Sequence, residues 1–290
     1  MMNGSWLLLA AIFLLLFITL LIIIANSVLF NPLPQRVWDP TGTYVFDDLM
    51  IDDRIHAWYF HPYPDSLTVL FCHGNTGNIT HCKFVVDLCL KNHLNILLFD
   101  YRGYGRSPGT PSQMGIMEDG LSAYQYLRQA GVSDDNIIVW GISLGGAVAA
   151  YIASKEPVRC VILMSTFSSI DDIIRDSNRT VLGEIGGTLS QAVTDMMDTK
   201  ELMPNIKSPT LIVHSIHDNL IPLRSALRLY RRSGSEHVQL LLIDGPHSSP
   251  RITTEQLCDI MTFCNTSSQY CQRESVEDVL NDIAGPRKWD

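Results

Sequence analysis

The sequence is poor in basic residues and contains no basic run. It has 21 lysines and arginines against 30 aspartates and glutamates, which gives a formal net charge of −9 at pH 7. Contact with the phosphates of a nucleic acid requires a concentrated basic face. We therefore predict that nucleic acid is not a partner of this chain.

Patterns that hold metals are also lacking. The seven cysteines form no C-x-x-C pair, and several lie in apolar runs, as Cys72 and Cys160 do, so we expect buried free thiols. His214 and His217 lie three residues apart at the end of a predicted strand. They lack the i, i+4 spacing of a helical zinc pair. The sequence implies no metal and no organic cofactor.

One long hydrophobic run lies near the N-terminus. Trp6 to Ala25 contains Thr19 as its only polar residue, and a helix of about 20 such residues spans a bilayer core of ~30 Å. A cleaved secretory signal is the alternative, but it requires a basic n-region and a shorter apolar stretch of roughly 7–15 residues. Met1 to Ser5 carries no charged side chain. We predict a single-pass signal anchor within residues 1–30, with the membrane bilayer as a partner. The sequence leaves the side of the membrane open.

The rest of the sequence predicts one catalytic domain. Two prolines predict a stiff linker over 31–37, the domain follows over 38–264, and 265–290 form a polar C-terminal tail. Most of the later β-type runs are continuously apolar, as is typical of strands buried on both faces of a parallel sheet. The predicted strands are Thr43–Phe46, Ile55–Phe60, Thr68–Cys72, Asn95–Phe99, Ile137–Trp140, Cys160–Met164, Thr210–His214 and Val238–Ile243.

Helical patterns between these runs supply the crossovers that parallel strands require. They cover Ile79–Lys91, Ser112–Gln129, Leu144–Ser154, Leu223–Arg231 and Thr253–Cys264. The first two strands lie close in sequence and fit an antiparallel hairpin. We predict an α/β fold with a doubly wound, mostly parallel sheet of about eight strands, and a small helical cap over about 167–204.

The motif around Ser143 is the strongest functional signal. G-I-S-L-G at residues 141–145 follows a predicted strand and precedes a helix of small residues. A sharp turn from strand to helix exposes a serine hydroxyl at the carboxyl edge of the sheet, and Gly141 and Gly145 leave room for the crowded backbone. The pentapeptide alone is a weak signal, but this context makes Ser143 the candidate nucleophile.

A serine hydroxyl needs a base and an orienting carboxylate, which follow this kind of turn in the order Asp, His. Asp218 and His247 each lie just beyond a predicted strand, where loops converge at the carboxyl edge of a parallel sheet. Asp244 is the rival carboxylate. It precedes His247 by three residues on the same loop, which is poor geometry for orienting the imidazole ring, so we favour Asp218.

The oxyanion of the reaction requires two backbone N–H donors. Leu144, directly after the nucleophile, is one candidate, and Asn75 in H-G-N-T-G-N is the other, because that loop directly follows a predicted strand. His73 resembles a general base, but we expect it to brace this loop by hydrogen bonds. Asn78 begins an N-x-T sequon that lies too near the site to carry a glycan.

The segment from Phe99 to Gly109 invites a dinucleotide-binding interpretation. That interpretation fails because Pro108 replaces the third glycine of G-x-G-x-x-G and no ribose-binding acid follows a second strand. We expect a loop that packs beneath the nucleophile turn.

H-G-N-T-G-N, D-Y-R-G-Y-G-R-S, G-I-S-L-G-G-A-V-A, H-D-N-L-I-P and D-G-P-H-S together make the chain resemble the membrane-anchored α/β-hydrolase-domain-containing proteins of the type-13 group. The resemblance runs from the anchor to the final helix. It implies the α/β-hydrolase fold, a triad of Ser143, Asp218 and His247, and a catalytic domain that follows a signal anchor. The chain departs from this group in two places: Ile142 replaces the arginine expected before the serine, which need not affect catalysis, and the cap, whose residues usually shape the acyl pocket, is more polar.

Three functional hypotheses follow. The first is a membrane-anchored serine hydrolase that cleaves acyl esters or acyl thioesters of lipid-linked substrates through an acyl-enzyme. The second is a serine aminopeptidase, which requires an acidic recess for the substrate amine. The third is a non-catalytic binding protein with a hydrolase fold. The presence of nucleophile, base, acid and oxyanion elements argues against it, because a chain without catalysis has no physical reason to keep all four.

Overall fold

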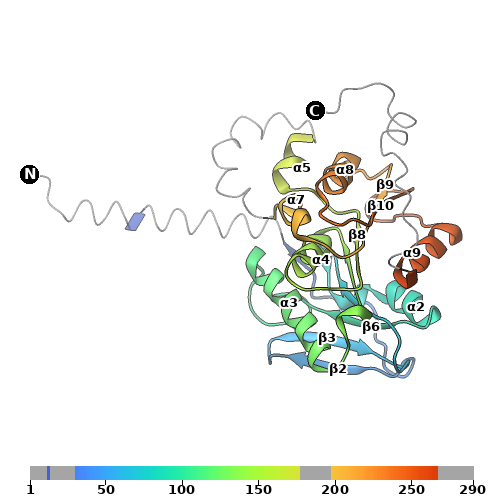
Figure 1. Ribbon diagram of the computed structural model, residues 1–290. Coiled ribbons are helices and arrows are strands. Elements are labelled where there is room, and N and C mark those ends of the chain that lie inside the picture. Colours follow the sequence, from blue (N-terminus) through green and yellow to red (C-terminus); the bar gives the residue numbers. More distant parts are fainter. Residues whose placement is uncertain (1–11, 14–29, 177–196, 267–290) are drawn as a thin grey trace, which may run out of the picture.

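The computed structural model describes residues 12–13, 30–176 and 197–266 (Figure 1). The predicted anchor, Trp6–Ala25, lies almost entirely outside the described residues, as do the middle of the predicted cap and nearly all of the predicted tail. None of the helices in the described ranges has both the length and the apolar character needed to cross a membrane.

An eight-stranded sheet runs through the described domain in the order β10-β9-β8-β7-β4-β6-β3-β2. All neighbouring strands are parallel except for the pairs β2/β3 and β3/β6. The predicted α/β-hydrolase fold with its mostly parallel sheet is confirmed, and the antiparallel hairpin in it is formed by β2 and β3. In chain order the strands are β2 (Asp47–Ile51), β3 (Ile55–Phe60), β4 (Thr68–Cys72), β6 (Asn95–Phe99), β7 (Ile137–Ile142), β8 (Cys160–Met164), β9 (Thr210–Ser215) and β10 (Val238–Ile243).

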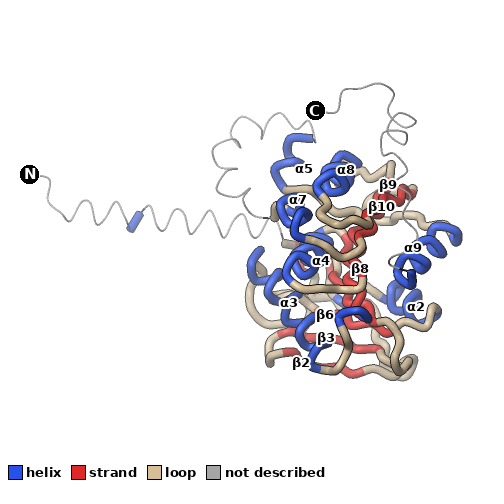
Figure 2. Tube along the Cα trace, viewed as in Figure 1, coloured by secondary structure: helices blue, strands red, loops and turns tan. Residues whose placement is uncertain are grey.

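Helices cover both faces of this sheet (Figure 2). One face packs α3 (Gln113–Gln129), α4 (Leu144–Lys155) and α8 (Leu223–Arg232), and the other packs α2 (Lys83–Lys91) and α9 (Thr254–Thr266). Alternation along the strands divides the core: in β4, Leu70 and Cys72 join the first apolar cluster, whereas Val69 and Phe71 join the second. Short 3-10 helices lie in the connections: η1 (Ile79–His81), η2 (Asp134–Asn136) and η3 (Met203–Asn205).

The first predicted strand, Thr43–Phe46, is wrong, because the strand that pairs with β3 is β2, directly after it. Tyr44 and Phe46 alternate as strand residues do, but their rings pack with Trp38, Trp58 and Phe60 in an aromatic cluster. The backbone before these rings forms a turn and not a strand, because the N–H of Tyr44 donates to the Pro40 carbonyl. Aromatic packing, not strand pairing, accounts for the pattern.

Residues 31–37, which we expected to be a linker, lie against the domain. The two-residue strand β1 (Asn31–Pro32) pairs in parallel with β5 (Thr76–Gly77). Phe30, directly before it, is 5 % exposed and belongs to an apolar cluster of the core. The prolines therefore do not separate this segment from the domain. We call residues 30–37 the N-terminal arm.

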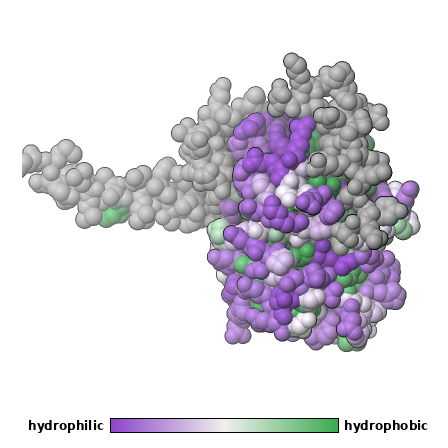
Figure 3. Space-filling view, in the orientation of Figure 1, coloured by the Kyte–Doolittle hydropathy of each residue, from purple (hydrophilic) through white to green (hydrophobic). Residues whose placement is uncertain are grey.

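Within the predicted cap the structure describes α5 (Ile170–Asp176) and α7 (Thr199–Leu202). Hydrophilic residues predominate on the face seen in Figure 3 and are dense over these two helices. Ion pairs join the cap helices to one another and to α8: Lys200 lies 3.0 Å from Asp172, and Arg228 lies 2.6 Å from Asp176. Both carboxylates are almost fully buried. The described ends of the cap are thus fixed to the domain by charge pairs.

The expectation of free thiols holds for the described cysteines, and five of them are buried: Cys72, Cys82, Cys89, Cys160 and Cys264. Cys258 is free but exposed. Burial raises the pKa of the Cys72 thiol well above its usual range, which keeps it protonated and unreactive.

Candidate active site

Ser143 lies at the tight turn between β7 and α4. Its φ of 55° and ψ of −117° are strained for a residue with a side chain. The surrounding glycines are required by close backbone contact: a Cβ on Gly141 would lie 2.1 Å from the Gly145 carbonyl oxygen, and a Cβ on Gly145 would lie 2.0 Å from the Cys72 carbonyl oxygen. The G-x-S-x-G pattern therefore forms the sharp turn that the sequence predicted.

The structure brings the three predicted triad residues together in one hydrogen-bonded chain. Nε2 of His247 lies 3.0 Å from Oγ of Ser143, and Nδ1 of His247 lies 2.8 Å from Oδ2 of Asp218. Asp218 comes from the β9–α8 loop and His247 from the β10–α9 loop, so all three residues follow the carboxyl ends of parallel strands at one edge of the sheet. The His247 backbone N–H also donates to Oδ1 of Asn219 at 3.2 Å, a contact that the sequence did not predict.

The Asp218 carboxylate is fully buried and accepts three hydrogen bonds. Beside the bond to His247, its Oδ1 accepts from the backbone N–H groups of Leu220 and Ile221 at 2.9 and 2.8 Å. Burial alone would raise the pKa of Asp218, but the hydrogen bonds from His247 and the two N–H groups outweigh it and hold the pKa below its usual value. Asp218 is therefore a stable anion that can orient His247.

Asp244, the rival acid, lies in a different set of contacts. Its side chain is 2.5 Å from Nδ1 of His217 and 2.5 Å from the Arg251 guanidinium. The hydrogen bond from His217, with those from the Gly245 N–H and Arg251, lowers the pKa of Asp244 to about 2. The side chain of Asp244 is about half exposed and pairs with His217 rather than with His247.

The two predicted oxyanion donors flank the nucleophile. Leu144 is the first residue of α4, where the backbone N–H has no acceptor within the helix. The H-G-N loop, which we define as His73–Asn78, lies on the other side: a Cβ on Gly74 would lie 3.9 Å from Cβ of Ser143. Asn75 follows directly. Its side-chain oxygen accepts hydrogen bonds from the Tyr104 hydroxyl at 2.8 Å and from the Asn31 backbone N–H at 3.1 Å.

His73 supports the H-G-N loop, as expected. It is 3 % exposed, its Nδ1 donates to the Gly74 carbonyl at 2.7 Å, and its ring lies against Tyr101 with centroids 4.3 Å apart. The Tyr101 hydroxyl donates to the His73 carbonyl at 2.9 Å. Burial lowers the pKa of His73, which favours a neutral ring in this position. The loop is thus fixed from below by aromatic residues of the Phe99–Gly109 segment.

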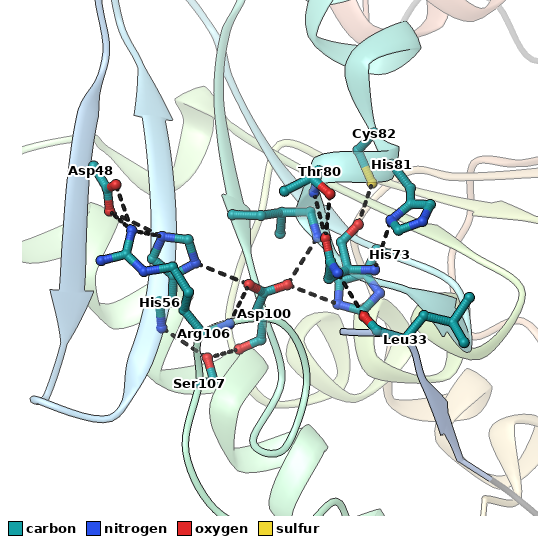
Figure 4. Close-up of polar contacts among 12 residues, drawn as sticks. Leu33, Asp48, His56, His73, Thr80, His81, Cys82, Asp100, Arg106 and Ser107 are labelled. Carbon is teal, nitrogen blue, oxygen red and sulfur yellow. Dashed lines mark hydrogen bonds and ion pairs between the residues drawn. The ribbon is translucent and has the colours of Figure 1, made fainter. Parts of the chain in front are cut away.

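Asp100 begins the connection after β6 and lies at the centre of a polar cluster beneath the H-G-N loop (Figure 4). Its Oδ1 accepts from the Ile79 N–H at 2.9 Å and its Oδ2 lies 3.0 Å from Nδ1 of His56. A Cβ on Gly105, whose φ is +50°, would lie 2.0 Å from the carboxylate. Asp100 was not among the residues predicted from the sequence. The signal was present, since an aspartate at a strand end is followed by the turn glycines Gly103 and Gly105.

The side chains of Asn78 and His214 are buried and donate hydrogen bonds to backbone carbonyls. Asn78 is 3 % exposed, and its amide nitrogen donates to the carbonyls of Leu33 and Gln35 at 2.8 and 3.1 Å, so the folded domain leaves no room for a glycan there. His214 is buried and donates from Nε2 to the Ile221 carbonyl, whereas His217 is exposed. In the ranges that the structure describes, no three His, Cys, Asp or Glu side chains gather as metal ligands.

Comparisons with known proteins agree with the fold. Residues 68–197 match the family model for the alpha/beta hydrolase fold. The alpha/beta hydrolase domain-containing protein WAV2 of Arabidopsis thaliana is 31 % identical over 219 residues, which cover 70 % of this chain and 71 % of WAV2. Bem46 of Schizosaccharomyces pombe is 31 % identical over 196 residues, covering 66 % of this chain and 62 % of bem46.

Solved structures share the fold at lower identity. An esterase from Pyrococcus furiosus superposes with a TM-score of 0.66 at 20 % identity, over 83 % of this chain and 99 % of the esterase. An acetyl xylan esterase from Paenibacillus superposes with a TM-score of 0.58 at 20 % identity, over 73 % and 79 %. The sequence matches, the sheet order and the turn at Ser143 lead to one conclusion: the chain belongs to the family of α/β-hydrolase-domain-containing proteins, with WAV2 and bem46 among its relatives.

Proposed function

We propose that this chain is a serine hydrolase that cleaves acyl esters or acyl thioesters through a covalent acyl-enzyme. The observation that carries the proposal is the hydrogen-bonded chain from Ser143 through His247 to the buried Asp218. A hydroxyl, an imidazole and a carboxylate in this order form the arrangement that activates a serine for attack on a carbonyl. No metal or organic cofactor enters the proposed reaction.

In the first half-reaction, Oγ of Ser143 attacks the acyl carbonyl carbon while Nε2 of His247 takes the hydroxyl proton. The Asp218 carboxylate holds the protonated ring through Nδ1–H. The backbone N–H groups of Leu144 and Asn75 donate to the oxygen on which negative charge develops. When the tetrahedral intermediate collapses, His247 returns its proton to the departing alcohol or thiol, and the acyl group remains on Ser143.

In the second half-reaction, water replaces the departed group. His247 takes a proton from the water, whose oxygen attacks the acyl-enzyme carbonyl, and the same two N–H groups stabilise the second oxyanion. Collapse releases the carboxylic acid as His247 returns the proton to Oγ of Ser143. The enzyme is then unchanged, and one water has been consumed for each ester cleaved.

The names of solved structures with the same fold favour ester hydrolysis over peptide cleavage. Several solved structures of the same fold are named esterases, and the sequence singles out no acidic residues that would bind the amine of a peptide substrate. A non-catalytic binding role would leave the strain at Ser143 and the buried Asp218 without a purpose. Both alternatives remain outcomes of the first experiment.

Reaction with a fluorophosphonate tests the mechanism. The full-length protein should be labelled covalently, and Ser143→Ala should abolish labelling because the phosphonyl group has no nucleophile to attach to. Equal labelling of the variant would place the nucleophile elsewhere. A panel of acyl esters, acyl thioesters and aminoacyl amides then separates the reaction classes: turnover of the amides alone would establish the peptidase alternative.

The type-13 resemblance and the run Trp6–Ala25 support a membrane-anchored enzyme that acts on lipid-linked substrates. Deletion of Met1–Ala25 should release a protein that still hydrolyses a short, water-soluble ester, since no proposed triad or oxyanion residue lies in that run. Hydrolysis of substrates embedded in vesicles should fall further, because the anchor raises the local concentration of enzyme at the membrane. Mass spectrometry of the membrane-bound protein decides whether the run is retained, and a mature N-terminus after Ala25 would contradict the anchor.

A further inference from the structure

The N-terminal arm (residues 30–37) makes its hydrogen bonds with one short stretch of the domain. The Asn31 backbone N–H donates to Oδ1 of Asn75 at 3.1 Å, and the Val37 N–H donates to Oγ1 of Thr80 at 3.0 Å. Between these two points, β1 pairs with β5. The arm therefore runs along the H-G-N loop (His73–Asn78) from the candidate oxyanion donor to the residues just beyond it.

Asn78 fastens the middle of the arm. Its amide nitrogen donates to the carbonyls of Leu33 and Gln35, while its amide oxygen accepts from the hydroxyl and the backbone N–H of Thr80. Figure 4 shows Leu33 and Thr80 on the side of Asp100 opposite His56. The Asn78 amide is buried and uses both of its polar atoms, so the arm and the loop form one hydrogen-bonded unit.

Asn75 is the point at which this unit reaches the site. Its side-chain oxygen accepts from two donors, the Asn31 N–H and the Tyr104 hydroxyl. Tyr104 is fully buried and comes from the segment beneath the loop, whereas Asn31 comes from the arm. The Asn75 carboxamide is therefore held between the two, and this fixes the orientation of the residue that follows Gly74 beside Ser143.

We propose that the N-terminal arm positions the oxyanion donor Asn75, with the Asn31 backbone N–H as the group that transmits its effect. The proposal rests on the proposed function, because it assigns a role within that reaction. Asn31 is a positioning residue and touches no reacting atom. Phe30 anchors the arm: its ring is buried in the cluster that also contains Tyr104 and Leu144.

A shift of Asn75 should act mainly on the transition state. An oxyanion donor interacts most strongly when charge has developed on the carbonyl oxygen, so a displaced donor lowers kcat more than it raises KM. Because a displacement near 1 Å can cost about a hundredfold in rate, a loosened arm should lower kcat by roughly tenfold or more. A role in stability alone would instead reduce the amount of active protein and leave kcat for each active site unchanged.

The experiment uses the full-length protein in detergent, with 4-nitrophenyl acetate as substrate and active sites counted by the end point of fluorophosphonate labelling. Asn31→Pro removes the N–H that donates to Asn75, and Asn31→Ala is its matched control, because it keeps that N–H. Phe30→Ala is the second variant, which removes the buried anchor and leaves the hydrogen-bonding groups of the arm in place.

We expect Asn31→Pro to lower kcat per active site by roughly tenfold or more with KM within about twofold, and Asn31→Ala to lower it far less. Binding of a trifluoromethyl ketone, which forms a tetrahedral adduct at Ser143, should weaken by the same factor as kcat/KM. Phe30→Ala should lower kcat in the same direction, and it decides the question if Asn31→Pro does not fold.

Unchanged kcat per active site in both Asn31→Pro and Phe30→Ala would overturn the proposal and leave the proposed function intact. Equal losses in Asn31→Pro and Asn31→Ala would also overturn it, since the backbone N–H would then not be the group that matters. A wild-type protein that neither reacts with the fluorophosphonate nor hydrolyses the ester would instead contradict the proposed function itself.

Discussion

Two carboxylate–histidine pairs connect the same two loops of the molecule. Asp218 of the β9–α8 loop pairs with His247 of the β10–α9 loop, and His217 of the first loop pairs with Asp244 of the second. The β9–α8 loop supplies the carboxylate of one pair and the histidine of the other, from the adjacent positions 218 and 217, and the β10–α9 loop supplies their partners. By residue type and pair geometry alone, either pair could hold a histidine for catalysis.

The pairs differ in burial and in their third partner. Asp218 is fully buried and its histidine is 15 % exposed, whereas His217 and Asp244 are 68 % and 48 % exposed. The first pair continues to the hydroxyl of Ser143, and the second ends on the guanidinium of Arg251. Burial removes water from one pair and leaves it around the other, so the same chemical groups form a buried pair that is suited to orient His247 in one place and a surface ion pair in the other.

The largest expected difference concerns the histidines. His247→Ala should lower kcat on the ester substrate by on the order of 10³ or more, because the base that takes the Ser143 proton is gone. His217→Ala should leave kcat within about twofold, the scatter expected of a side chain that makes no contact with the site. Steady-state kinetics normalised to active-site counts measures both. A reversal of this order would mean that the surface pair is the catalytic one.

The acids should differ in the same direction by a smaller margin. Asp218→Asn keeps the shape of the side chain but removes the charge that stabilises the protonated ring, so kcat should fall by on the order of 10³. Asp244→Asn should retain kcat within about threefold, since Asp244 contacts His217 and Arg251. Near-normal turnover of Asp218→Asn together with a large loss in Asp244→Asn would move the acid to Asp244.

Much of this contrast could be predicted from the sequence, because strand ends and turn order place residues at one edge of a parallel sheet. Ser143, Asp218 and His247 were predicted from this order, and the structure brings them together. Asp244 was set aside for its position three residues before His247, and it indeed pairs with another histidine. Periodicity likewise predicted seven of the eight strands of the main sheet, with ends within two residues of those observed.

Contacts between segments distant in sequence could not be predicted. The prolines of residues 31–37 indicated a linker, yet the partners of that segment lie about 45 residues away in the H-G-N loop. The turn glycines after Asp100 could have marked that residue, but its partners His56 and Ile79 could not be predicted, because they come from two other elements. Local patterns report which face of an element is apolar, but a buried polar hub is defined only when the chain has folded around it.

The stability of the fold at acidic pH should also depend on Asp218. The pKa of Asp218 is lower in the folded protein than its usual value, so its ionised form stabilises the fold above the unfolded pKa of about 3.9. That stability is lost as the pH falls through the folded pKa. Urea unfolding should show wild type more stable than Asp218→Asn at pH 7, with the gap closing below about pH 4. A gap that widens in acid would mean that the buried carboxylate destabilises the fold.

The smallest effect should come from the stability of the surface pair. The pKa of Asp244 is also lowered, to about 2, but the groups that lower it lie in water, where salt screens them. The Arg251 backbone N–H donates to the Asp244 carbonyl at 2.7 Å, and this bond survives in Asp244→Asn. We expect the Tm of Asp244→Asn to lie no more than about 2 °C below that of the wild type at low salt, and this difference to vanish near 1 M salt. The Tm difference of Asp218→Asn should persist near 1 M salt, because burial shields the Asp218 carboxylate from ions. Thermal unfolding at the two salt concentrations measures this, and a salt-independent loss in Asp244→Asn would show that the exposed pair holds the β10–α9 loop as firmly as the buried one does.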